Sequence, residues 1–317
     1  MPGRCVQRAA ATLPRVSAPA ASAAHREVRR ALLDWYAAEH RDVPWRESRD
    51  PYAVLVSEVM LQQTQASRIT QRFPTFMSRF PTAASLASAP AAAVLAEWSG
   101  LGYNRRALAL QRAAAIVSRD GWPSDVAGLA RLPGIGPYTA RAVASLAFGI
   151  PIGVVDTNVR RWLLRRFGGP DQPQRLQELA DALAAPGKGH DVAAWTHATM
   201  EFGATICRAR RARCDACPIA RGCPSRNAAA SVAVPRHPAL WGSDRAYRGA
   251  VVRLLSGTPG HGLPERDLRR QLALDAGRIG PKLGESRWER IMDALVRDGL
   301  AHRSGEIVRL GAATIES

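Results

Sequence analysis

The sequence predicts an all-α protein with a small α+β domain at its C-terminal end. Two observations carry this prediction: apolar residues recur with the helical period in segment after segment, and the composition changes after Cys223. The length of 317 residues, with 46% hydrophobic and 22% charged residues, fits one or two globular domains rather than a disordered or fibrous chain. The longest nearly uncharged stretch, residues 142–155, is too short and too interrupted for a transmembrane helix.

The first helix is predicted over residues 27–38, where apolar side chains share one face and Val43-Pro44 follows as a stop signal. Further helices are predicted over residues 52–69, 91–98, 105–117, 126–132, 138–148 and 159–167. Glycine and proline separate these segments, for example at Gly121-Trp122-Pro123, and alternating strand runs are absent from the sequence between them. The pattern is typical of helices joined by short turns.

A linker is predicted over residues 225–243, where alanine, serine and proline replace the helical pattern. Helical periodicity resumes around residues 247–255, 264–272 and 288–298. A hairpin is then predicted, with Gly305-Glu306 between residues 301–302 and 307–308. Three helices followed by a hairpin predict a winged-helix-like domain over residues 244–317.

The first 24 residues contain arginines but no acidic residue, and they lack the apolar segment of a signal peptide. We interpret them as a disordered leader, or as residues upstream of the true start codon.

The charge balance favours a polyanionic partner. Lysine and arginine number 44 against 27 acidic residues, which gives a net charge of +17 and a pI near 11.1. Such a field attracts nucleic acid in the first place and an anionic membrane surface in the second.

One glycine-built turn is predicted between two helices, at Leu132-Pro133-Gly134-Ile135-Gly136-Pro137-Tyr138-Thr139-Ala140. Gly134 and Gly136 can adopt the positive φ that a reversal needs, and Pro137 suits the first turn of the next helix. The amides at that helix start could bind a phosphate. An ordinary helix–helix turn is the alternative, but the net charge favours a helix-hairpin-helix motif that binds the DNA backbone.

Four cysteines lie within 17 residues and indicate a metal site. They are Cys207, Cys214, Cys217 and Cys223. Four thiolates hold either tetrahedral zinc or an iron–sulfur cluster, and the spacing leaves both open. Arginines at 208, 210, 211 and 213 lie between the first two cysteines, so we expect this loop to contact DNA rather than to be only a solvated surface loop.

Two carboxylates are candidates for acid–base work. Glu58 shares a mainly apolar helix face, which should raise its pKa and keep it protonated; a buried glutamate paired with an arginine is the alternative. Asp156 precedes a predicted helix, where backbone N–H groups and the helix dipole would hold it anionic; simple capping is the alternative. An acid and an anion together would suit cleavage of a glycosidic bond.

These features, in this order, resemble the endonuclease III-like helix-hairpin-helix DNA glycosylases and, within them, the MutY group of adenine glycosylases. The match spans residues 26–224. It is carried by Val43-Pro44-Trp45-Arg46, Ser57 to Gln65, Gly100-Leu101-Gly102-Tyr103, Leu132 to Ala140, Val155-Asp156-Thr157-Asn158 and the cysteine spacing. The resemblance implies a two-lobed helical fold, with a six-helix lobe at about 45–155 and a cluster lobe formed by 25–44 and 156–224. It also implies a [4Fe-4S] cluster rather than zinc on the four cysteines.

The resemblance also implies catalytic roles. Glu58 would protonate the adenine base, Asp156 would stabilise the oxocarbenium-like sugar, and Asn158 would orient Asp156. Tyr138 occupies the position of the Schiff-base lysine of the lyase branch, so the resemblance implies a monofunctional enzyme that uses water. The adenine would be flipped out of a bent duplex before cleavage.

Other positions are expected to bind DNA. Gln63 and Thr64 would enter the duplex near the opposite base, Leu101 with Tyr103 would act as a wedge, and Gly134 and Gly136 would bind the backbone. Arg46, Trp45 and Glu201 resemble the adenine pocket. The implied partner is double-stranded DNA with adenine opposite 8-oxoguanine or guanine, bound by a monomer in the cytoplasm, at the nucleoid, without a membrane partner.

Two departures from the family pattern stand out. Thr157 stands where most adenine glycosylases have glycine, and the tail lacks the pattern and the length of the MutT-like domain that reads 8-oxoguanine. Recognition of 8-oxoguanine would then come from the winged-helix-like tail, from the catalytic lobes, or be weak.

Two other readings stay open. The first is another glycosylase of the superfamily, an oxidised-pyrimidine lyase or a thymine-mismatch enzyme, which Tyr138 and Glu58 respectively disfavour. The second is a non-catalytic, metal-containing DNA-binding protein, which leaves the surroundings of Glu58 and Asp156 unexplained.

Overall fold

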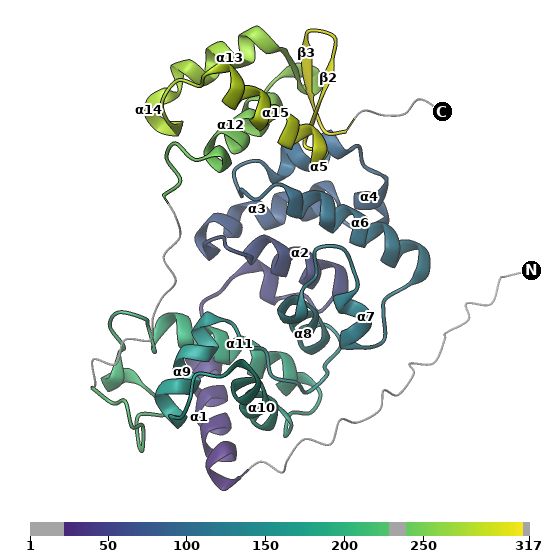
Figure 1. Cartoon of the computed structure of the whole chain (residues 1–317). Helices are drawn as coiled ribbons and strands as arrows, with labels where there is room; N and C mark the ends of the chain where they lie inside the picture. Colours follow the sequence, from purple (N-terminus) through teal and green to yellow (C-terminus); the bar gives the residue numbers. More distant parts are fainter. Residues whose placement is uncertain (1–21, 228–238, 313–317) are drawn as a thin grey trace, which may run out of the picture. The chain divides into compact units, whose positions relative to one another are not determined.

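The computed structural model describes residues 22–227 and 239–312 and is mainly helical (Figure 1). Within these ranges, no helix is long and apolar enough to cross a membrane. The chain divides into two units: the first unit contains the described residues up to Arg41 and from Trp122 to Asn227, and the second contains Asp42–Gly121 and the described residues from Ala239. Most of the predicted leader and linker, at 1–21 and 228–238, lies outside the described residues.

The first unit is a helical assembly around one apolar core. Its helices are α1 (Ala23–Glu39), α7 (Val126–Ala130), α8 (Pro137–Leu146), α9 (Thr157–Phe167), α10 (Pro173–Ala184), α11 (His190–Thr205) and the 3-10 turn Cys214–Ala216. Helix α11 packs against α1, α8 and α9. The core between them includes Leu32, Trp162, Trp195 and Phe202, all at most 3% exposed. Helices α10 and α11 were not predicted from the sequence.

This division groups α7 and α8 with the helices that follow Asp156, whereas the sequence analysis assigned residues 45–155 to one lobe. The lobe boundaries stay a prediction.

The second unit begins with the 3-10 turn Pro44–Arg46. Its next helices are α2 (Pro51–Leu61), α3 (Ala66–Arg79), α4 (Ala83–Ser88), α5 (Ala91–Trp98) and α6 (Arg105–Asp120). The single helix predicted over 52–69 is wrong, because the chain turns between α2 and α3 with Gln63 at φ +54°. The Arg106 guanidinium binds the carbonyl oxygens of Val59 and Gln62, at 2.6 and 2.5 Å, and so stabilises this turn.

The C-terminal domain has the predicted winged-helix order. It contains α12 (Asp244–Ser256), β1 (Gly262–Pro264), α13 (Glu265–Leu274), α14 (Ala276–Ile279), α15 (Glu285–Arg297), β2 (Ala301–Ser304) and β3 (Ile307–Leu310). The predicted hairpin is β2–β3; β1, not predicted, pairs antiparallel with β3 and gives the strand order β1-β3-β2. Within the second unit, α12 and β3 pack against α5.

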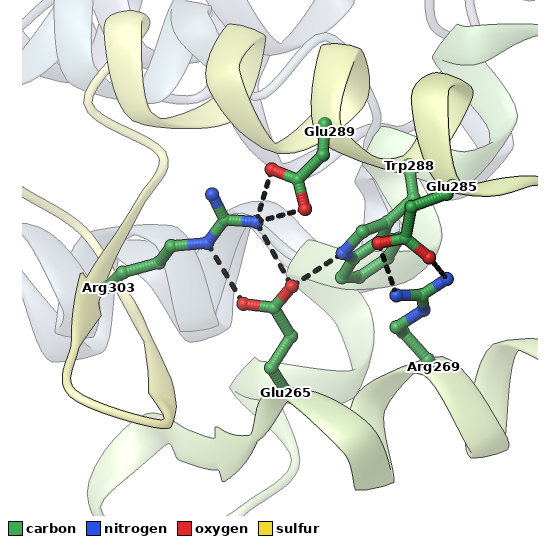
Figure 2. Close-up of polar contacts among 6 residues, drawn as sticks. All are labelled: Glu265, Arg269, Glu285, Trp288, Glu289 and Arg303. Atoms are coloured by element: carbon green, nitrogen blue, oxygen red, sulfur yellow. Dashed lines mark hydrogen bonds and ion pairs between the residues drawn. The ribbon is translucent and has the colours of Figure 1, made fainter.

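Ion pairs tie the C-terminal helices to the hairpin. Figure 2 shows Glu265 accepting hydrogen bonds from Arg303 of β2, at 2.9 and 3.0 Å, and from the Trp288 indole at 2.6 Å. Arg303 also donates to Glu289, and Arg269 pairs with Glu285. Arg269 and Arg303 therefore stabilise the fold of this domain.

Candidate active site and cysteine loop

Glu58 lies on α2, which is buried from Tyr52 to Met60. The helix begins at Pro51 after the Asp50 N-cap, whose carboxylate accepts the N–H groups of Tyr52 and Ala53. Glu58 itself is 4% exposed. The sequence predicted one mainly apolar face, whereas the structure buries α2 on all sides, from Tyr52 to Met60, and burial makes an ionised carboxylate costly.

Asp156 is the N-cap of α9, as predicted. One carboxylate oxygen accepts the Val159 N–H at 2.6 Å and the other accepts the Asn158 side-chain amide at 2.7 Å. The predicted pairing of Asn158 with Asp156 is therefore present. Burial raises the pKa of Asp156 and outweighs these hydrogen bonds and the Arg161 charge, which lower it; the sequence showed only the capping interactions.

Three residues missed by the sequence analysis fix the start of α9. Gly153 passes α10 so closely that a Cβ there would lie 2.4 Å from the Ala180 carbonyl carbon. Gly203 on α11 also lies close to α9: a Cβ at this position would lie 2.8 Å from the backbone carbonyl of Asn158. Arg161 donates to the oxygen atoms of Asn158 and Gly203, at 2.9 and 2.5 Å. Only long-range packing reveals these roles, since none belongs to a recognisable short motif.

The glycine turn before α8 has the predicted helix-capping form with one correction. Gly134 has φ +77°, whereas Gly136 is the N-cap at φ −87°, so only the first glycine needs a left-handed backbone. Gly136 is exposed, and a Cβ there would meet no atom within 4 Å. Pro137 occupies the first helical turn. The N-terminal amides of α8 have no acceptors inside the helix, and open space before them suits a phosphate.

Tyr138 follows this turn and is partly buried. Its hydroxyl lies 4.0 Å from the Met200 sulfur of α11. A phenol at this position offers no amine for a Schiff base.

The predicted pocket residues fall in both units. Trp45 and Arg46, like Glu58, belong to the second unit; Trp45 is 7% exposed and packs edge to face against Phe73. Glu201, like Asp156 and Tyr138, belongs to the first unit. It is 1% exposed and accepts from the Arg41 guanidinium at 2.5 and 2.8 Å, a partner that the sequence analysis missed.

The predicted DNA-contacting residues of the second unit lie around Arg106. Gln63 is exposed, and the Thr64 hydroxyl accepts from Arg106 at 3.1 Å. Tyr103 is 36% exposed, whereas Leu101 is 4% exposed. Of the two predicted wedge residues, only Tyr103 therefore offers appreciable surface in this structure.

The four cysteines are free thiols, all partly buried, in one loop after α11. The pKa of Cys217 is raised to about 11, mainly by burial and in part by the charges of the other three cysteines, so the four sulfurs share one electrostatic environment. Burial raises the pKa of Cys207, whereas Arg165 of α9, which donates to its sulfur at 3.5 Å, lowers it in part. In the described ranges no three potential ligands are arranged around a single metal ion, but four thiols with a cationic neighbour fit the donor set of a cluster.

The loop between Cys207 and Cys214 is strongly basic. Arg208, Arg210, Arg211 and Arg213 are all exposed, and they line a surface hollow together with Asp215. None of these four arginines forms a salt bridge with a carboxylate of the described residues. This surface can accept an anion without first breaking an ion pair.

Comparisons with known proteins match both the sequence and the fold. Residues 56–186 match the family model described as HhH-GPD superfamily base excision DNA repair protein. An adenine DNA glycosylase of Mycobacterium tuberculosis is 42% identical over 234 residues, which are 71% of this chain and 77% of that protein. A human adenine DNA glycosylase is 42% identical over 216 residues, 62% of this chain and 39% of that protein.

Solved structures give the same fold. A thermostable thymine-DNA glycosylase superposes with a TM-score of 0.59 at 29% identity, over 64% of this chain and 97% of that one. A trapped endonuclease III–DNA covalent intermediate superposes with a TM-score of 0.54 at 23% identity, over 64% and 97%.

Proposed function

Since the chain belongs to the HhH-GPD superfamily of base excision DNA repair proteins and, within it, to the adenine DNA glycosylases, we propose that it hydrolyses the N-glycosidic bond of adenine mispaired with 8-oxoguanine or guanine. The observation that carries the proposal is the burial of Glu58, which is 4% exposed on a helix buried from Tyr52 to Met60. A carboxylic acid in such a place can supply the proton that a poor leaving group needs.

In this mechanism the mispaired adenine leaves the base stack, and a mispair lowers the cost of that step. Glu58 donates its proton to a ring nitrogen of adenine, and the glycosidic bond breaks as positive charge grows on the sugar. Asp156 stabilises that charge. Burial opposes its ionisation, but the Val159 N–H and the Asn158 amide hold the anion in place, and its carboxylate gains most when a cation forms beside it.

Water completes the reaction. Because Tyr138 provides no amine, we propose a monofunctional enzyme that leaves the abasic strand intact. We further propose that it acts as a monomer on the DNA of the cytoplasm.

We propose that Cys207, Cys214, Cys217 and Cys223 hold a [4Fe-4S] cluster. When bound, the cluster supplies iron–thiolate bonds that fix the loop. The loop arginines would then face the phosphates of the duplex, and the amides before α8 would bind a second stretch of backbone.

A substrate panel tests the function. Wild-type protein and Glu58→Gln are given duplexes with adenine opposite 8-oxoguanine, G, C or T, with a G:T mispair and with oxidised pyrimidines, and strands are analysed before and after alkali. We expect wild type to remove adenine opposite 8-oxoguanine and G, with breaks only after alkali. Glu58→Gln should bind the duplex but act about 10²- to 10⁴-fold more slowly, the usual contribution of a general acid.

Breaks without alkali would identify a lyase, and removal of thymine alone would identify a thymine-mismatch enzyme. Equal rates for wild type and Glu58→Gln would remove the acid role.

A further inference from the structure

Tyr103 is held in an uncommon backbone conformation. It ends the loop between α5 and α6 with φ +48°, which a bulky side chain rarely adopts without support from its surroundings. Arg106 gives part of that support, since its guanidinium lies 5.5 Å from the tyrosine ring and donates to the Gly102 carbonyl at 3.0 Å. The Trp98 indole donates to the same carbonyl at 3.2 Å. The loop backbone is therefore fixed from within the α5–α6 region.

The ring of Tyr103 has a second cationic neighbour, which comes from the C-terminal domain. Arg245, in the first turn of α12, places its guanidinium 5.2 Å from the centre of the ring. One of its nitrogen atoms also donates to the phenol oxygen. A cation near the ring and a hydrogen bond to its far end together restrict the rotation of the side chain.

Arg245 is itself held in place. Helix α12 and strand β3 pack against α5 in the same unit. Asp298, which follows α15, accepts from Arg248 of α12 and lies 3.7 Å from Arg105 at the start of α6. These contacts flank the α5–α6 loop, so α12 presents Arg245 to Tyr103 from a packed surface.

We propose that Arg245 is a positioning residue for Tyr103, through which the C-terminal domain sets the orientation of the tyrosine that enters the duplex beside the mispair. This inference rests on the proposed function, in which Tyr103 is the wedge. The C-terminal domain thereby contributes to mispair recognition without reading a base itself. Several of its own arginines, among them Arg253, Arg269 and Arg303, are paired with carboxylates, which favours this role over direct DNA binding.

The test measures base unstacking and does not require catalysis. Full-length protein is mixed with a duplex in which 2-aminopurine is adjacent to an adenine opposite 8-oxoguanine; the adenosine carries a 2′-fluorine so that its glycosidic bond survives. We expect wild type to raise the 2-aminopurine fluorescence. Arg245→Met should lower the amplitude at least about threefold, as is usual for coupled neighbours. Arg245→Lys should lie between them, and Arg266→Met, at an exposed site on α13, should match wild type.

A double mutant separates positioning from direct contact. In Tyr103→Leu, which keeps an apolar side chain, the fluorescence rise should be reduced, and adding Arg245→Met should leave the remaining rise unchanged, because Arg245 acts through the tyrosine. The salt dependence of duplex binding should be the same in wild type and Arg245→Met, whereas loss of a phosphate contact would reduce the slope by about one. Thermal unfolding of each variant verifies that it is folded.

An Arg245→Met amplitude equal to wild type, a further loss in the Tyr103→Leu background, or a reduced salt slope would each overturn the inference, as would absence of any rise with wild type. A fluorescence rise with wild type that removes no adenine from the unmodified duplex would instead refute the proposed function and leave this inference standing.

Discussion

Two regions of the molecule use arginines and carboxylates in opposite ways. The first is the cysteine loop with the start of α9, and the second is the C-terminal domain. In the cysteine loop, exposed arginines stand without a carboxylate partner among the described residues. In the C-terminal domain, most arginines are paired. The pairs there are Arg248–Asp298, Arg253–Asp275, Arg269–Glu285, Arg270–Asp267, Arg287–Asp244, Arg290–Asp244 and Arg303 with both Glu265 and Glu289.

The carboxylates of the two regions also differ, because their pKa values are shifted in opposite directions. Asp156, at the start of α9, has its pKa raised by burial. Glu265, at the start of α13, is also partly buried, but hydrogen bonds from Arg303 and Trp288 outweigh that burial and lower its pKa. A net charge of +17 therefore does not locate the DNA-binding surface. We propose that ion pairing does, because charges already paired stabilise the fold, whereas the others can act on a ligand.

The largest effect is expected at Asp156. Asp156→Asn removes the anion that we propose stabilises the sugar cation, so base removal should fall by about 10²- to 10³-fold, as for other electrostatic contacts to a transition state. Folding stability should not fall at pH 7, since asparagine caps a helix as well as aspartate does. The measurements are single-turnover rates and thermal unfolding midpoints.

The raised pKa of Asp156 predicts how the stability difference between wild type and Asp156→Asn changes with pH. Because the folded pKa lies above the unfolded value of about 3.9, stabilisation by this group is complete below that value and is lost as the pH rises through the folded pKa. The Asp156→Asn variant does not undergo this loss, because asparagine does not ionise. It should therefore be at least as stable as wild type at pH 7, with the difference shrinking toward pH 4; a variant clearly less stable at pH 7 would contradict this reading of Asp156.

A smaller effect is expected for the cysteine loop. In Arg210→Gln with Arg211→Gln, two phosphate contacts are lost, so the slope of log binding constant against log salt should become shallower by about 1.8. The matched control is Arg270→Gln with Arg290→Gln, which removes the same charge from exposed, carboxylate-paired positions of the C-terminal domain. Its slope should equal that of wild type. Equal slopes for both double variants would break the comparison between the two regions.

Features that depend on neighbours in the chain could be predicted from the sequence. The capping of α9 by Asp156, Pro137 in the first turn of α8 and the winged-helix order all follow from patterns a few residues long. The apolar surroundings of Glu58 could be predicted in part, because α2 is apolar along its length.

Features that depend on distant residues could not be predicted. The turn at Gln63 depends on Arg106, which binds a carbonyl 47 residues away, and Arg245 meets Tyr103 across 142 residues. The burial of Asp156, which raises its pKa, could not be predicted for the same reason. The capping hydrogen bonds are local and visible in the sequence, whereas the burial that outweighs them comes from tertiary packing.

The smallest effect is expected at Glu265, and its sign is opposite to that at Asp156. Glu265→Gln weakens the hydrogen bonds from Arg303 and Trp288 in a partly exposed network, so the free energy of unfolding should fall by about 1 kcal/mol at pH 7. The folded pKa of Glu265 is lowered, so its stabilisation is present above the unfolded value of about 4.3 and is lost as the pH falls through the folded pKa. The variant and wild type should therefore converge in acid.

The matched control for Glu265→Gln is Asp120→Asn, which removes a carboxylate from an ion pair with Arg119 that lies in solvent at the end of α6. Urea unfolding at pH 7 and at a pH well below 4 should show no change for this control, while adenine removal stays unchanged in both variants. A loss of activity with Glu265→Gln at full stability would mean that the C-terminal network contributes to the reaction directly. The division between charges that stabilise and charges that act on DNA would then fail in the region where ion pairing is densest.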